Sequence, residues 1–302
     1  GGQLGLLGPG LKRLYANDNV IESVDLKGLS KLGGLIDMNL ARNKISDSIE
    51  EASSKLTALD LSENLLKAVP PFLLTAAGLL KLNLSGNMIS KLPDRLFGSC
   101  VLITSLDLHN NHINSLPNNL FALRKVEYMD LSFNRIAQAI PRMLENFTEL
   151  RTLLLSNNAI SELPESIGAL TCLEVLEVEE NKLTQFPNDG VVQLERLRRV
   201  TTKKNDIKIR PWSLFQLPAL RSWDMSWNRD IVCRYIDWDD RERVFQRDRD
   251  VASIDFLSVL LKRANRSAGY EPTEKLESND ALVSAFDYFD AKRADEEREN
   301  AL

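Results

Sequence analysis

One eleven-residue frame, L-x-x-L-x-L-x-x-N-x-L, recurs ten times along this 302-residue chain. Its asparagines are Asn19, Asn43, Asn64, Asn87, Asn111, Asn134, Asn158, Asn181, Asn205 and Asn228. The frames open at Leu11, Leu35, Leu56, Leu79, Ile103, Val126, Leu150, Leu173, Leu197 and Leu220, so consecutive openings lie 21 to 24 residues apart. A unit repeated at this period predicts a solenoid, because each unit buries its apolar side only by stacking on its neighbours.

Within each frame, the alternation of leucine with other residues predicts a short strand with one buried and one exposed side. In the third frame, Leu59 and Leu61 are expected to face the core, and Asp60 and Ser62 the solvent. Asn64 stands where the chain leaves the strand, and its amide offers two donors and an acceptor. Because backbone groups at such a bend need partners, the asparagines are predicted to form a hydrogen-bonded ladder through the solenoid.

The stretches between the frames carry a second repeated signal, an apolar residue followed by proline. It occurs at Leu92-Pro93, Leu116-Pro117, Ile140-Pro141, Leu163-Pro164 and Phe186-Pro187. Proline fixes φ and lacks an amide hydrogen, which suits a turn that enters a short helix or 3₁₀ segment. Over about residues 11–231 the chain resembles the leucine-rich-repeat family. Its L-P-x-x-L-F-x-L arm is similar to that of the intracellular subclass of Ras-pathway scaffolds and plant Ras-group repeat proteins.

The resemblance implies an α/β leucine-rich-repeat solenoid, or horseshoe, with ten short parallel strands on the concave face and short helices or 3₁₀ turns on the convex face. Residues 1–10 are interpreted as the remnant of a preceding repeat or an N-terminal edge, and 11–231 as ten repeats. Residues 232–302 are expected to form a helical C-terminal cap and a charged tail. In that segment, the apolar spacing predicts amphipathic helices near 251–263 and 280–300.

The composition agrees with an intracellular protein. The three cysteines, Cys100, Cys172 and Cys233, are odd in number and far apart, a pattern unlike the paired clusters of secreted repeat proteins. They are interpreted as unreactive core thiols. No apolar run approaches the roughly 18 residues that a transmembrane helix needs. A cytoplasmic location is therefore expected, with mitochondrial and cytoskeletal locations left open.

The sequence contains no glycine-rich phosphate loop, serine elbow or metal-spaced cysteine and histidine set, so no enzyme activity and no cofactor are predicted. One set of residues has the chemistry of metal ligands: both histidines of the chain, His109 and His112, with Asp107 and Asp130 nearby. Exposed strand positions account for these polar residues without an ion, so no metal site is predicted.

Function is predicted to lie on the exposed strand positions, which carry an acidic column and, in the fifth and sixth repeats, an aromatic cluster. Exposed aromatic and arginine side chains are typical of the centres of protein interfaces, and a column of carboxylates would steer a basic partner. The predicted partner-binding residues are Asp107, His109, Tyr128, Asp130, Phe133, Arg135 and Trp227. The chain is thus expected to be an adaptor or regulatory scaffold that binds a protein, such as a signalling protein, on its concave face.

Two alternatives remain open at this stage. The chain could be a structural subunit of a large assembly, axonemal or ribosome-like, that is held through its edges and C-terminal tail. A basic cluster could also contact RNA within such a particle. The cluster consists of Arg196, Arg198, Arg199, Lys203, Lys204, Lys208 and Arg210. Glu177, Glu179 and Glu180 of the preceding repeat are expected to neutralise it, which disfavours nucleic acid as a partner.

The predicted cap leads to a test by truncation. Deleting the residues after 230 should expose the core of the last repeat, because the helix near 251–263 is interpreted as its cover. Light scattering should then show aggregation, and thermal unfolding should begin at a lower temperature. A truncated protein that stays monomeric and melts unchanged would contradict the cap and assign the helix to a partner.

Overall fold

The structure is a computed structural model that describes residues 10–23, 32–46, 49, 53–137, 143–209, 211–228, 232–236 and 242–246. The chain divides into two compact units, residues 1–246 and 247–302. All of the described residues belong to the first unit.

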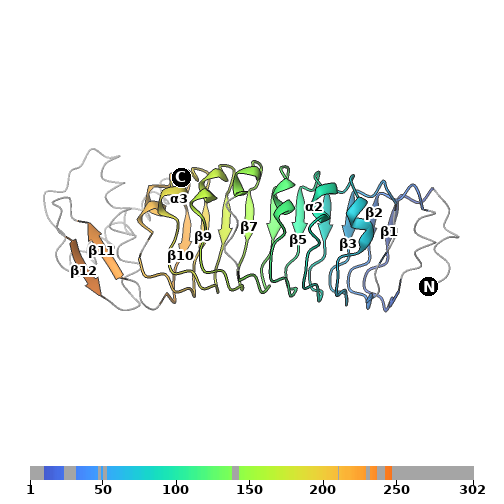
Figure 1. Cartoon of the computed structure of the whole chain (residues 1–302), viewed down its shortest axis with the longest axis horizontal. Coiled ribbons are helices and arrows are strands. Elements are labelled where there is room, and N and C mark those ends of the chain that lie inside the picture. Colours follow the sequence, from blue (N-terminus) through green and yellow to red (C-terminus); the bar gives the residue numbers. More distant parts are fainter. Residues whose placement is uncertain are drawn as a thin grey trace, which may run out of the picture. The chain divides into compact units, whose positions relative to one another are not determined.

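Ten three-residue strands pair in chain order to form one parallel sheet (Figure 1). They are β1 (Arg13–Tyr15), β2 (Asp37–Asn39), β3 (Ala58–Asp60), β4 (Lys81–Asn83), β5 (Ser105–Asp107), β6 (Tyr128–Asp130), β7 (Thr152–Leu154), β8 (Val175–Glu177), β9 (Arg199–Thr201) and β10 (Ser222–Asp224). The register is constant, so that Leu82 of β4 pairs with Leu106 of β5 and Leu106 pairs with Met129 of β6. The predicted leucine-rich-repeat solenoid, with one strand in each frame, is confirmed.

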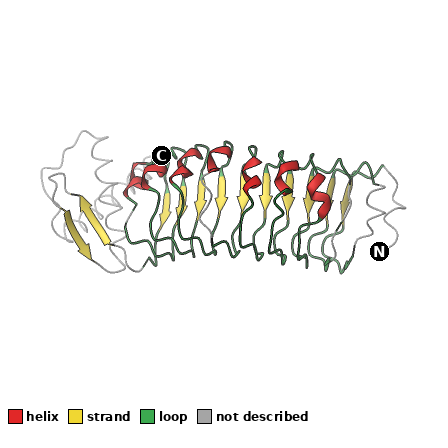
Figure 2. Cartoon of the chain, viewed as in Figure 1, coloured by secondary structure: helices red, strands yellow, loops and turns green. Residues whose placement is uncertain are grey.

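Short helical segments connect most of the strands, and Figure 2 shows them following one another alongside the row of strands. They are η2 (Pro71–Thr75), α2 (Leu96–Ser99), η3 (Asn118–Ala122), η4 (Met143–Asn146), η5 (Glu165–Ala169), α3 (Asn188–Val191) and η6 (Trp212–Gln216). Pro117, Pro164 and Pro187 precede the first residues of η3, η5 and α3, as the repeated proline predicts. Leu120 and Phe121 are buried in the core behind the sheet.

The C-terminal part of the first unit contains an antiparallel pair of strands that the sequence analysis does not predict. These are β11 (Val232–Ile236) and β12 (Glu242–Gln246), with Arg234 opposite Val244. The β-branched and aromatic residues of β11 favour a strand, but a search for helical periodicity passes over so short a segment. The helices predicted near 251–263 and 280–300 lie outside the described residues, as does the side chain of Cys233.

The core is a continuous column of side chains that repeats the frame. Leu106, Met129 and Leu153 from the centres of successive strands are all at most 3% exposed. Cys100 is fully buried, and its thiol lies 3.1 Å from the carbonyl oxygen of Leu73. Burial raises the pKa of the Cys100 thiol to about 11, so the neutral, unreactive form predominates at pH 7.

Buried asparagine side chains link each repeat to the one before it. The Nδ2 atom of Asn134 donates to the carbonyl oxygens of Leu108, Leu131 and Ser132 at 3.0, 3.1 and 3.1 Å. Its Oδ1 atom accepts from the amide of Ile113, 2.9 Å away in the preceding repeat. The same pattern recurs at Asn64 and Asn87. These are the hydrogen bonds expected of the predicted ladder.

The residue before each ladder asparagine has a left-handed backbone conformation. The ten residues are Asp18, Arg42, Glu63, Gly86, Asn110, Phe133, Asn157, Glu180, Lys204 and Trp227, with φ between 50° and 62°. This conformation turns the chain so that the asparagine side chain points back under the strand. Since a non-glycine residue is strained in this region, the fold accepts a local cost to make the ladder in every repeat except the fourth, where Gly86 adopts this conformation freely.

Replacing Asn134 by Ala should lower the free energy of unfolding by about 1–3 kcal/mol, because buried carbonyl groups and an amide lose their partners. Leu131→Ala should cost more, roughly 2–5 kcal/mol, because it opens a cavity in the continuous core. The measurement is denaturant unfolding of both variants. As a control, Asn114→Ala at an exposed position should change stability by less than about 0.5 kcal/mol. An Asn134 variant as stable as this control would contradict the ladder.

Candidate functional site

The exposed face of the sheet carries two rows of side chains, one from each end of the strands. The first row consists of Arg13, Asp37, Ala58, Lys81, Ser105, Tyr128, Thr152, Val175, Arg199 and Ser222. The second row consists of Tyr15, Asn39, Asp60, Asn83, Asp107, Asp130, Leu154, Glu177, Thr201 and Asp224. Because the register is constant, members of one row lie beside one another on neighbouring strands, about 4.8 Å apart.

The acidic column predicted as a binding surface is the second row, and it has a structural role that the sequence analysis missed. Oδ1 of Asp60 accepts hydrogen bonds from the amide and the hydroxyl of Ser62, at 2.9 and 2.6 Å. An equivalent side-chain acceptor closes the turn two residues on in five other repeats, at Asn39, Asn83, Asp107, Asp130 and Asp224. In the seventh repeat, Leu154 stands at this position, and the buried hydroxyl of Ser156 has no partner among the described residues.

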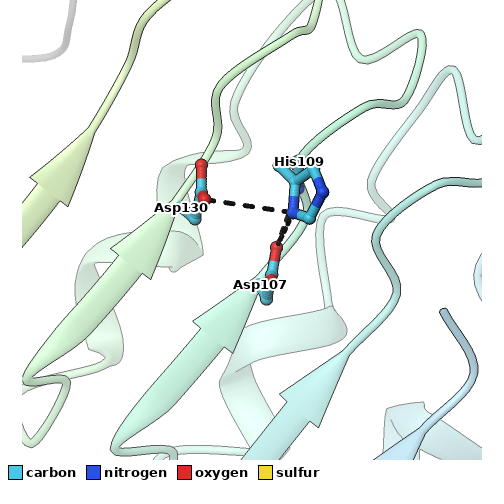
Figure 3. A group of neighbouring side chains, drawn as sticks. All are labelled: Asp107, His109 and Asp130. Carbon is cyan, nitrogen blue, oxygen red and sulfur yellow. Dashed lines mark hydrogen bonds and ion pairs between the residues drawn. The ribbon is translucent and has the colours of Figure 1, made fainter. Parts of the chain in front are cut away.

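Three of the predicted site residues meet where β5 and β6 end (Figure 3). Nδ1 of His109 lies 2.7 Å from Oδ1 of Asp107 and 3.9 Å from Oδ2 of Asp130. Their potential ligand atoms lie within 4.8 Å of one another, whereas His112 is not part of this group. The contact between His109 and Asp107 repeats the one between Ser62 and Asp60. The repeated turn therefore accounts for the cluster without an ion, and we assign no metal to it.

Tyr128 and Asp130 are less accessible than the sequence analysis expected. Asp130 is 7% exposed, and its carboxylate accepts from the amide and hydroxyl of Ser132 and from the hydroxyl of Tyr128. Burial raises the pKa of the half-buried Tyr128, and the nearby carboxylates of Asp130 and Asp107 raise it further. The surroundings of Tyr128 are therefore negatively charged. Replacing Asp130 by a basic residue would remove the acceptor for Ser132 and so disrupt the turn after β6. A change in partner association in such a variant could therefore not be attributed to the charge alone.

Phe133 and Trp227 are the two aromatic residues at the left-handed position, and both are exposed, by 55% and 56%. Most of the other repeats have polar residues there, and one has glycine. A large apolar side chain in strained backbone on the surface is not explained by the core. The exposed ring of Phe133 therefore supports a hypothesis of function, with partner contact as the candidate role.

The predicted site residues therefore fall into separate groups. Asp107, His109, Tyr128 and Asp130 lie together on β5 and β6 and at the turn after β5. Phe133 and the exposed Arg135 lie in the segment after β6, three and five residues beyond its end. Trp227 follows β10, four strands further on, which corresponds to about 19 Å along the sheet.

A groove of about 350 Å³ runs over the exposed face from β1 to β6. It is lined by Tyr15, Asp37, Asn39, Ala58, Leu59, Asp60, Lys81, Leu82, Asn83, Ser105, Asp107 and Tyr128. Tyr15, Asp37 and Lys81 are not among the site residues predicted from the sequence. The alternation of the strands could have predicted two of them. Asp37 and Lys81 stand two residues before members of the second row, so they lie on the same face of the sheet.

Acidic residues of the adjacent repeat form ion pairs with three of the seven residues of the basic cluster that was considered for RNA contact. Arg198 pairs with Glu174 at 3.1 Å, and Arg199 with Glu177 at 3.1 Å. Lys204 forms an ion pair with Glu180. These pairs agree with the predicted neutralisation and reduce the positive field that nucleic acid would need.

Two family profiles match the chain. A profile described as leucine rich repeat matches residues 54–113 and 102–160, and one described as leucine rich repeats in two copies matches residues 148–190. Together with the ten-stranded fold and the structural neighbours below, these matches identify the chain as a leucine-rich-repeat protein. Leucine-rich-repeat domains generally mediate protein–protein interaction, and the family is typically non-enzymatic. No curated protein sequence matches the chain significantly.

Among solved structures, a leucine-rich-repeat protein of Leptospira interrogans is 26% identical, with a TM-score of 0.67 over 79% of this chain. The match covers 58% of the Leptospira chain, so the present chain spans little more than half of that protein. The functional domain of InlJ from Listeria monocytogenes, which includes a cysteine ladder, is 18% identical over 75% of this chain and 55% of that one, with a TM-score of 0.53. The second likeness shows the fold alone.

Within the described residues, no helix is both long and apolar enough to span a membrane.

The strained aromatic turn leads to a stability test. Phe133→Gly should raise the free energy of unfolding by about 0.5–1 kcal/mol, since relief of about 1–2 kcal/mol of left-handed strain exceeds the entropic cost of glycine. Gly86→Ala at the same turn position should lower it, because the new Cβ would lie 3.0 Å from Cγ of Glu63 in a left-handed backbone. Denaturant unfolding compares the two. A Phe133→Gly variant less stable than the parent protein would show that the ring serves the fold.

Proposed function

We propose that this chain is a non-catalytic binding module, an adaptor or regulatory scaffold, that holds a partner protein against the exposed face of its sheet around β5 and β6. The observation that carries the proposal is the exposed ring of Phe133 on a strained turn, three residues after the strand that contains Tyr128. The cytoplasmic location and the likeness to Ras-pathway scaffolds stay predictions.

The chemistry of this region supports a protein partner. Aromatic rings supply large contact areas at low conformational cost, and they are frequent at the energetic centres of interfaces. Tyr128 is half-buried and braced by Asp130, so its ring is held in position before a partner arrives. The neighbouring carboxylate of Asp107 and the side chain of His109 would form the polar rim around these rings.

A capture experiment tests the proposal. The wild-type chain and a Tyr128→Ala/Phe133→Ala variant are immobilised, and proteins retained from a lysate of the source organism are compared by quantitative mass spectrometry. We expect at least one protein to be retained by the wild type and depleted by the variant about tenfold or more. Loss of the two rings should remove on the order of 2 kcal/mol of binding free energy.

A matched control separates this site from other apolar surface. Leu80→Ala/Val101→Ala removes two side chains that are each 40% exposed, precede β4 and β5 in the chain, and are not among the predicted site residues. This control should retain the same proteins as the wild type. If the aromatic variant also retains them all, the partner does not bind here, and the alternative of an assembly subunit held through its edges gains support.

A further inference from the structure

We propose that the groove between Tyr15 and Tyr128 binds an extended, positively charged segment of the partner protein. The inference rests on the proposed function and specifies the chemistry of the partner. It concerns one continuous surface, from β1 to β6, on a sheet face that no described element covers.

The groove has an excess of negative charge. Its lining includes the carboxylates of Asp37, Asp60 and Asp107 and one basic side chain, that of Lys81. In Asp60 and Asp107, the repeated turn uses only Oδ1. Among the described residues, no hydrogen bond reaches Oδ2 of either side chain. These atoms remain available to donors from a guanidinium or an ammonium group, whereas the same carboxylates would repel phosphate groups.

The length of the groove fits an extended peptide segment. Five strand spacings of about 4.8 Å separate β1 from β6, which gives roughly 24 Å, the length of about seven extended residues. Asp60 and Asp107 lie two strands apart, at about 10 Å. This separation matches basic residues three positions apart in an extended segment of polyproline II conformation, where such residues share one side and lie about 9 Å apart. Lys81, on the strand between them, disfavours a third basic residue at the middle of the segment.

Tyrosines bound the groove at both ends. Tyr15 is 59% exposed, so its ring contributes little to the core, and its hydroxyl donates to Oδ2 of Asp37 at 2.7 Å. Tyr128 donates to Asp130 in the same manner at the other end. Each end thus combines an aromatic ring with a carboxylate, a pairing that attracts arginine and lysine through both the ring and the charge.

The chain itself offers a variant that removes the charge without disturbing the turn. Asn39 and Asn83 accept the turn amides of Ala41 and Ser85 at 2.9 and 3.0 Å, as aspartate does in other repeats. Asp60→Asn/Asp107→Asn should therefore fold and melt like the wild type. Asp224→Asn is the matched control, because it changes the same turn position in the last repeat, outside the groove.

The test is selection of a displayed random octapeptide library on the wild-type chain and on both variants. We expect the wild type and Asp224→Asn to enrich sequences with arginine or lysine three positions apart, and the double variant to enrich none of these. In fluorescence anisotropy, the best peptide should bind the double variant about tenfold more weakly, and its affinity for the wild type should fall as salt rises.

Enrichment of acidic or purely apolar peptides, equal binding to the double variant, or no enrichment would each overturn the proposal. The proposed function is judged separately by the protein captured on Tyr128 and Phe133. If the aromatic variant loses that protein while Asp60→Asn/Asp107→Asn retains it at full affinity, the face binds a partner but not through a basic segment. If the aromatic variant and Asp60→Asn/Asp107→Asn both retain the captured protein at full affinity, the proposed function fails as well.

Discussion

The structure depends on the satisfaction of buried backbone groups at the bend after each strand. A repeat of this length turns its chain inside the protein, where an unpaired carbonyl or amide is costly. A ladder asparagine such as Asn134 supplies hydrogen-bond partners to backbone groups of two repeats. It donates to the carbonyl oxygen of Leu108 in the preceding repeat and to that of Leu131 in its own. Each bond across repeats fixes their spacing and register. The constant register of the sheet, and hence the alignment of side chains in rows on its exposed face, follows from this constraint.

The same constraint limits what the exposed face can vary. Second-row residues such as Asp60 and Asn83 supply an acceptor to the next turn, and either an acid or an amide does so with similar geometry. The choice between them sets the charge of the face at little structural cost. The side chain at the left-handed position can vary comparably, because the ladder requires the backbone conformation of this residue and not its side chain. An exposed ring at Phe133 and carboxylates over the groove are therefore the features in which binding could be selected independently of folding.

The period of the asparagines was enough to predict the ten strands and the ladder. An asparagine such as Asn64 that recurs at the end of each strand is suited to bond the backbone groups of the bend there. The site was only partly predictable. Alternation placed Asp107 and Tyr128 on the exposed face, but it could not show that Asp130 is nearly buried or that Oδ1 of Asp107 closes a turn. The groove draws its lining from six strands, so its composition appears only once the register is known. The antiparallel pair of β11 and β12 lies outside the repeat, so no sequence period indicated it.

Side-chain footprinting of the chain, alone and with a captured partner protein, tests the central claim most directly. Hydroxyl radicals label exposed aromatic and aliphatic side chains, and mass spectrometry reports the labelling at each position. The account predicts that the partner protects Tyr128 and Phe133 and leaves Leu80 and Val101 unchanged. Labelling at Tyr128 and Phe133 that is the same with and without bound partner would contradict binding at the exposed face of the sheet.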